Sequence, residues 1–102
     1  MAEFVTVGRP GDVPEGEVRA FEVEGTRVAV ARVDGSFHAF DDTCTHQLCS
    51  LADGDLEATA VICPCHGSEF DVTSGAVLAP PAVEPVRTFA VRVEGDALQI
   101  EA

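Results

Sequence analysis

The stretch that decides the fold reads Cys44-Thr45-His46-Gln47-Leu48-Cys49 and, after sixteen residues beyond His46, Cys63-Pro64-Cys65-His66-Gly67-Ser68. All four cysteines and two of the three histidines of the chain fall between positions 44 and 66. They form two similar Cys/His loops, each with turn-forming neighbours. Such a concentration of soft ligands predicts a metal centre or a redox-active cysteine pair.

The spacing within the first loop bears on the kind of metal. Structural zinc sites usually take two ligands from a loop in which two to four residues separate them. In Cys44-Thr45-His46 a single residue intervenes, so both side chains converge on one tetrahedral ion only awkwardly. A two-iron cluster removes the difficulty, because each loop sends its Cys to one iron and its His to the other. Cys44 and Cys63 then share one iron, and His46 and His66 share the other. A structural zinc domain that mediates protein contacts stays open as the alternative.

On both sides of the loops, apolar residues alternate with the period of β-strands. Glu24-Gly25 and Asp34-Gly35 are hairpin turn signals. The sequence predicts strands at Phe4–Val7, Val18–Val23, Thr26–Val33, Ser36–Phe40, Thr59–Ile62, Glu69–Val72, Ala76–Leu78, Arg87–Val93 and Ala97–Glu101. A single turn near Leu48–Ala52 is the best helical candidate. The expected fold class is therefore all-β, with a loop-rich, ligand-bearing insert at about 41–84.

Charge and length exclude several functions. The 102 residues suit one domain, and the net charge is −12, with eighteen acidic residues against six arginines. This charge disfavours nucleic acid and anionic membranes as partners, whereas it suits a basic protein partner or simple solubility. No apolar run reaches the roughly 18 residues that span a bilayer, and the first residues do not resemble a secretory signal. We therefore expect a cytoplasmic protein, in which clustered cysteines are more often ligands or redox-active groups than structural cross-links.

The C-x-H and C-x-x-H loops resemble those of the Rieske proteins, in which two His replace two Cys on one iron of a [2Fe–2S] cluster. The similarity extends to Asp42-Thr43 before the first loop, to Glu69-Phe70-Asp71 after the second, and to Ser74-Gly75 with Pro80-Pro81-Ala82. It implies an antiparallel β sandwich or partial barrel, formed by residues 1–40 and 85–102, with the insert as a cluster-binding subdomain. It also implies one [2Fe–2S] cluster per chain, held by Cys44, His46, Cys63 and His66.

The same resemblance gives further residues a role. Cys49 and Cys65 occupy the positions at which high-potential respiratory members carry a disulfide, although many soluble dioxygenase ferredoxins lack the pair. We predict a disulfide here; two reduced thiols are the alternative. Ser68 matches a serine that donates a hydrogen bond to a cluster sulfide, unless it merely caps a turn. Phe70 replaces a tyrosine donor of the highest-potential members, so an intermediate reduction potential is expected.

The sequence looks most like the soluble ferredoxin component of bacterial ring-hydroxylating dioxygenases. This similarity implies a one-electron carrier, not an enzyme, that takes electrons from a flavin-dependent reductase and passes them to a terminal oxygenase. We expect a monomer that docks through an uncharged surface formed by Gln47, Leu48, Gly67, Pro80 and Pro81. Two alternatives remain open. One is an electron-donor module of another redox enzyme, such as another soluble oxygenase or a nitrite reductase small subunit, and the other is a thiol-redox or sensor protein that works through Cys49 and Cys65.

Overall fold

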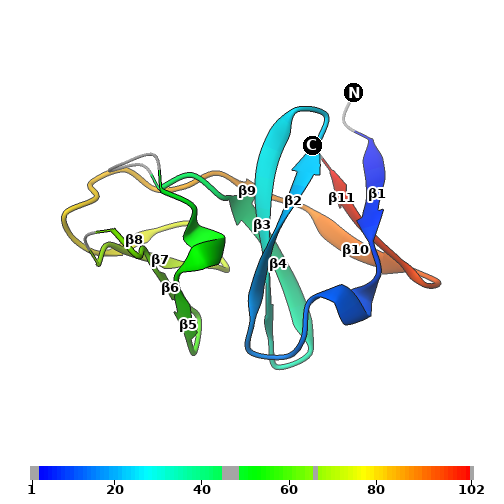
Figure 1. Ribbon diagram of the computed structural model, residues 1–102, viewed down its shortest axis with the longest axis horizontal. Coiled ribbons are helices and arrows are strands. Elements are labelled where there is room, and N and C mark those ends of the chain that lie inside the picture. The colour runs from blue at the N-terminus through cyan, green and yellow to red at the C-terminus, as the bar shows by residue number, and fades with distance from the viewer. Residues whose placement is uncertain (1–2, 45–48, 66, 102) are drawn as a thin grey trace.

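The computed structural model describes residues 3–44, 49–65 and 67–101, which fold into antiparallel sheets (Figure 1). The strands are β1 (Phe4–Gly8), β2 (Val18–Val23), β3 (Thr26–Val33), β4 (Ser36–Asp41), β5 (Asp55–Glu57), β6 (Ala60–Ile62), β7 (Glu69–Asp71), β8 (Val77–Ala79), β9 (Thr88–Phe89), β10 (Val91–Glu94) and β11 (Ala97–Glu101), with 3₁₀ turns η1 (Pro10–Asp12) and η2 (Leu51–Asp53). Three sheets result, with strand orders β1-β11-β10, β2-β3-β4-β9 and β5-β6-β7-β8. The expected all-β fold class is confirmed. Within the described residues, no helix is long and apolar enough to span a membrane.

The sheet β2-β3-β4-β9, the central sheet, is covered on both faces. Strand β3 shows this most clearly. Four consecutive residues of β3, 28–31, are buried, because successive side chains of a strand point to opposite faces and both faces meet a core. One face packs into the base core (Val13, Val23, Val28, Val30, Ala39, Leu98 and Ile100). The other face packs into the site core (Val18, Ala29, Ala31, Phe40, Cys44, Leu51, Val61, Cys63, Phe70, Val72, Ala82 and Val86). The sheet β5-β6-β7-β8 is therefore attached to the rest of the molecule through the site core.

Most predicted strands agree with the structure to within one residue at each end, but three details differ. The run Arg87–Val93 is not one strand: β9 pairs with β4, and β10 pairs with β11 in another sheet. The alternation continues through Ala90, so the pattern alone does not reveal the change of sheet. The strand β5 was missed, since Asp and Glu are poor strand formers at its ends. The helical turn predicted near Leu48–Ala52 lies slightly later, at η2.

The return segment after β8 is tied to the third sheet at Gly75. The Val86 N–H donates to the Gly75 carbonyl at 3.0 Å, and the Gly75 N–H donates to the Asp71 carbonyl at 2.7 Å. Gly75 has φ +80°, and a Cβ atom there would collide with the Val86 carbonyl oxygen. Only glycine satisfies both the backbone conformation and the close approach. Further along, the Asp41 N–H donates to the Arg87 carbonyl at 2.9 Å, which continues the connection into the central sheet.

Candidate metal centre

The first cysteine loop starts at the end of β4 and is closed like a hairpin. The Cys44 N–H donates to the Cys49 carbonyl at 3.0 Å, and Thr43 forms an isolated bridge with Ser50. Cys44 is 2% exposed and belongs to the site core, whereas Cys49 is half-buried. The predicted ligand His46 and the predicted docking residues Gln47 and Leu48 lie outside the described residues.

A buried carboxylate holds both ends of this loop. Asp42, 1% exposed, accepts hydrogen bonds at Oδ2 from Ser50 Oγ (2.6 Å) and Arg27 Nε (2.7 Å), and at Oδ1 from the Ala52 N–H (2.9 Å). Its backbone carbonyl accepts the Leu51 N–H at 2.7 Å. The hydrogen bond from Arg27 and the attraction between the two charges raise the pKa of the Arg27 guanidinium. Sequence reasoning noted Asp42 only within a family motif and missed this role.

The second cysteine loop joins β6 to β7. The Cys63 N–H donates to the Ser68 carbonyl at 2.7 Å, and the Gly67 N–H donates back to the Cys63 carbonyl at 3.1 Å. Gly67 adopts φ +78°, a conformation that glycine accepts without strain. Cys63 is 2% exposed and lies in the site core, which also contains Cys44. The predicted ligand His66 lies outside the described residues.

Ser68 links the second loop to the segment that follows β8. Its side chain is fully buried, and its Oγ accepts the Ala82 N–H at 3.0 Å. Because a hydroxyl both accepts and donates, this bond leaves the hydroxyl proton for another acceptor. The partner lies fourteen residues away, so the Ser68 side chain is not simply a local turn cap. Phe70 is also fully buried but offers no donor. The Pro80–Pro81 peptide bond before Ala82 is cis.

A disulfide joins the two loops, as predicted. It links Cys49 with Cys65, whose Cα atoms lie 6.5 Å apart. Cys65 is exposed, and the Sγ atoms of Cys49, Cys63 and Cys65 all lie within 4.8 Å of one another. Cys44 and Cys63 are outside the disulfide. The structure therefore gathers sulfur atoms from both loops at one place.

The described cysteines fit a [2Fe–2S] cluster. One buried thiol comes from each loop, Cys44 and Cys63, and both sit in the site core, where water is excluded. Thiolates in an apolar environment are the ligands that iron–sulfur clusters use. Ser68 is bonded to Cys63 through its backbone carbonyl, and its buried Oγ accepts the Ala82 N–H, so the hydroxyl proton stays available for another acceptor. The full ligand set of Cys44, His46, Cys63 and His66 stays a prediction.

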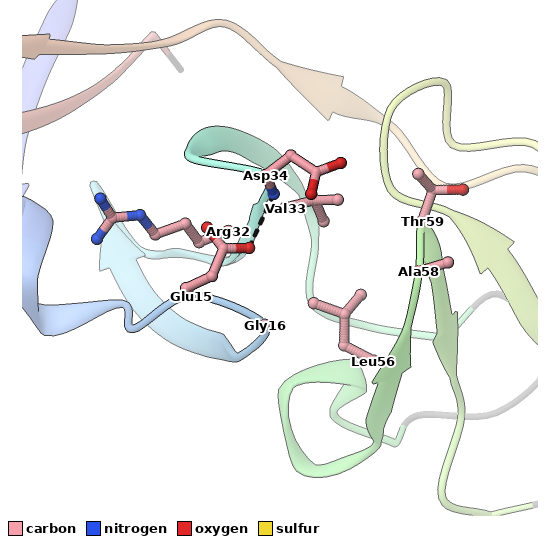
Figure 2. Close-up of a pocket in the computed structure, with 8 residues that line it drawn as sticks. All are labelled: Glu15, Gly16, Arg32, Val33, Asp34, Leu56, Ala58 and Thr59. Atoms are coloured by element: carbon pink, nitrogen blue, oxygen red, sulfur yellow. Dashed lines mark hydrogen bonds between the residues drawn. The ribbon is translucent and has the colours of Figure 1, made fainter.

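A cleft in the described part of the chain lies elsewhere. It has a volume of about 310 Å³ and lies between the chain before β2, the β3–β4 turn and the β5–β6 hairpin (Figure 2). Glu15 closes the turn there by accepting the N–H groups of Asp34 (2.8 Å) and Gly35 (2.7 Å). None of the eight residues drawn along this cleft is a cysteine or a histidine. The cleft therefore does not mark the metal centre.

A family model described as the Rieske [2Fe–2S] domain matches residues 3–90. The chain belongs to the Rieske [2Fe–2S] family. Its cofactor is accordingly a Rieske [2Fe–2S] cluster. The Rieske chain is 37% identical over 90 residues to the ferredoxin component of a naphthalene 1,2-dioxygenase system from Pseudomonas aeruginosa, covering 88% of this chain and 86% of that protein. It is 40% identical over 91 residues to the ferredoxin component of biphenyl 2,3-dioxygenase from Rhodococcus jostii, covering 89% and 85%.

Solved ferredoxin structures share the fold over nearly their full length. The ferredoxin of carbazole 1,9a-dioxygenase from Nocardioides aromaticivorans superposes with a TM-score of 0.91 and 34% identity, covering 95% of each chain. A chain in a complex of reduced oxygenase and oxidized ferredoxin of carbazole 1,9a-dioxygenase gives a TM-score of 0.90 at 32% identity, covering 96% of this chain and 92% of that one. These relatives are named as ferredoxins, which are electron carriers and not catalysts.

Proposed function

We propose that this Rieske protein is the ferredoxin component of an aromatic-ring dioxygenase system and carries single electrons to the terminal oxygenase. The observation that carries the proposal is the similarity, over more than four-fifths of both chains, to ferredoxin components of such systems. A flavin-dependent reductase is the proposed electron donor. We further propose that the protein acts as a cytoplasmic monomer.

In this proposal Cys44 and Cys63 hold one iron, and His46 and His66 hold the other. When bound, the cluster would supply one-electron transfer at a potential of roughly −150 to +300 mV, the range for His/Cys ligation, against about −400 mV for plant-type ligation. The burial of Cys44 and Cys63 would keep water from the two thiolates, and the Ser68 hydroxyl, whose oxygen accepts the Ala82 N–H, would have its proton left to donate. Because Phe70 has no hydroxyl, a second donor of this kind is missing, and we expect a potential between those of members with both hydroxyls and members with neither.

The distribution of charge supports docking through the face around the cysteine loops. The segments 43–52, 58–68 and 72–83 contain no Asp, Glu or Arg, although the whole chain carries a net charge of −12. The Ser68–Ala82 hydrogen bond brings the last of these segments beside the second loop. Gly67, Pro80 and Pro81 are exposed there, and Val83, which sequence reasoning missed, is 86% exposed. An uncharged contact area with acidic residues outside it suits a transient complex that charge brings together.

The cofactor is tested by electron paramagnetic resonance of anaerobically purified, dithionite-reduced protein. We expect a rhombic signal with the low average g value of mixed His/Cys ligation. A spectrum of the all-thiolate type would mean that Cys49 or Cys65 is a ligand, and a colourless, silent protein would revive the zinc alternative. Replacing His66→Cys is expected to lower the potential or abolish the cluster; an unchanged spectrum would refute the ligand assignment.

The docking face is tested by adding charge to it. Val83→Glu is expected to slow electron transfer to a biphenyl or naphthalene dioxygenase oxygenase at least tenfold, which corresponds to about 1.4 kcal/mol of lost complex stability. Val93→Glu is the matched control, because Val93 is 45% exposed but lies on β10 in the base. Equal rates for the two variants in stopped-flow measurements would place the docking face elsewhere.

A further inference from the structure

The disulfide between Cys49 and Cys65 lies close to a third sulfur atom, that of Cys63. Among the described residues, Cys49, Cys63 and Cys65 are the group whose ligand atoms come close enough to hold a metal ion, with all three Sγ atoms within 4.8 Å. Four-coordinate zinc with Zn–S bonds of about 2.3 Å places its sulfur ligands about 3.8 Å apart. After reduction, the sulfur atoms of Cys49 and Cys65 would have to move apart by about 2 Å to reach this separation, whereas Cys63 Sγ already lies within 4.8 Å of both.

We propose that reduction of the Cys49–Cys65 disulfide creates a second metal site, in which the thiolates of Cys49, Cys63 and Cys65 bind a thiophilic ion such as Zn²⁺. A dithiol reductant supplies the two electrons and is itself oxidised to a disulfide, while the sulfur atoms of Cys49 and Cys65 each become a thiol. The three thiols lose their protons as the ion binds, since only thiolates coordinate it. Water or another side chain completes the coordination.

The loops stay in place for this purpose even without the disulfide. Hydrogen bonds to Asp42 fix both ends of the first loop. The second loop is held by the bond from Cys63 N–H to the Ser68 carbonyl and by the bond from Ala82 N–H to Ser68 Oγ. Reduction therefore breaks a covalent link between loops that other contacts keep positioned. Because Cys65 is exposed, a reductant reaches the disulfide from solvent.

The second site and the cluster compete, because Cys63 is needed by both. An ion on Cys49, Cys63 and Cys65 removes a predicted iron ligand and blocks loading of the cluster. The intact disulfide withholds two of the three thiolates and so protects the cluster site from the wrong metal. This role is distinct from that of stabilising the fold, and it does not depend on which oxygenase the protein serves.

The first experiment titrates cluster-free, full-length Cys44→Ser protein with Co²⁺, a spectroscopic substitute for Zn²⁺. This variant cannot hold the cluster yet keeps the three proposed ligands. After reduction by a phosphine, we expect one Co²⁺ per chain, with a thiolate charge-transfer band and the visible bands of tetrahedral cobalt that Zn²⁺ abolishes. The oxidised variant should bind at least 100-fold more weakly. Equal binding before and after reduction would overturn the proposal, as would a disulfide that has moved to Cys63.

The second experiment uses the cluster-loaded protein, so that it does not depend on how well the cluster-free variant folds. Excess Zn²⁺ is added with and without the phosphine, and cluster loss is followed by visible absorption. We expect Zn²⁺ to accelerate the loss at least tenfold only after reduction. In the Cys49→Ser/Cys65→Ser double variant, Zn²⁺ should cause no such acceleration with or without the phosphine. Acceleration in that variant equal to the reduced wild type would refute the three-thiolate site.

Discussion

Replacing Asp42→Ala should loosen the first cysteine loop, because the buried carboxylate holds both of its ends. The substitution removes the acceptor of the Ala52 N–H (2.9 Å) and of the Ser50 hydroxyl (2.6 Å). The Ala52 N–H is partly buried, and such a group left without its acceptor costs about 1–3 kcal/mol, while the lost hydroxyl bond adds about 1 kcal/mol. Arg27 contributes nothing to this sum, because its guanidinium is in contact with water. We expect the free energy of unfolding to fall by about 2–4 kcal/mol.

The control is the same substitution at the preceding residue. Asp41 accepts the Thr43 N–H at 3.1 Å and contacts Arg87 at 3.4 Å, but its side chain is 26% exposed, so water replaces much of what Asp41→Ala removes. Its loss is expected to stay within about 1 kcal/mol. Urea denaturation followed by circular dichroism measures both variants, and the half-life of the cluster under a chelator reports on the loop itself. If the two variants lose equal stability and keep the cluster equally long, the anchoring role of Asp42 is wrong.

Three further substitutions test other parts of the structure. Ser68→Ala is expected to lower the reduction potential, measured by voltammetry, by about 60–130 mV. The substitution removes a hydrogen bond that stabilises the reduced cluster by about 1.5–3 kcal/mol more than the oxidised one. An unchanged potential would show that the hydroxyl donates elsewhere. The pKa of Asp71 lies below its ordinary 3.8, because the Thr73 side chain and N–H donate to its carboxylate. The stabilisation from these hydrogen bonds is fully present above the ordinary pKa of Asp71 and is lost as the pH falls through the lower pKa of Asp71 in the folded protein. Thr73→Ala should therefore lower the melting temperature at neutral pH, and the two proteins should melt alike in strong acid. Gly75→Ala should destabilise the fold far more than Gly25→Ala when the two variants are melted in parallel. Both glycines have positive φ, but of the two only Gly75 lies where a Cβ atom would meet a backbone carbonyl. Similar losses of stability in the two variants would contradict the predicted collision.

Local patterns in the sequence predict the parts of this fold that depend on neighbours in the chain. The hairpins β2–β3 and β3–β4 follow from alternation interrupted by Glu24-Gly25 and Asp34-Gly35. The division of the run after Arg87 between two sheets depends on which distant strand each half meets, and no local pattern records that choice. The alternation is the same in both sheets.

At the metal centre, too, contacts between distant parts of the chain could not be predicted from local sequence patterns. The cysteine loops could be predicted, because the residue types and their spacing are rare in other settings. The disulfide could be predicted only from the resemblance to Rieske proteins that carry one at these positions. The anchoring role of Asp42 could not, since one of its donors, Arg27, comes from another strand fifteen residues earlier. The 86% exposure of Val83 was also unpredictable, because an apolar residue beside prolines has no sequence feature that distinguishes a surface position from a core position.

Strand β3 contributes to both cores, with Val28 and Val30 on one face and Ala29 and Ala31 on the other. Neither the part of the chain around the site core nor the part around the base core can therefore open alone without exposing one face of β3. Amide protons in the middle of β3 should exchange with deuterated solvent only when the whole chain unfolds, and they should exchange more slowly than those of the short strands β5 and β8. Any event that strengthens the site core, including loading of the cluster, will slow exchange throughout the base as well.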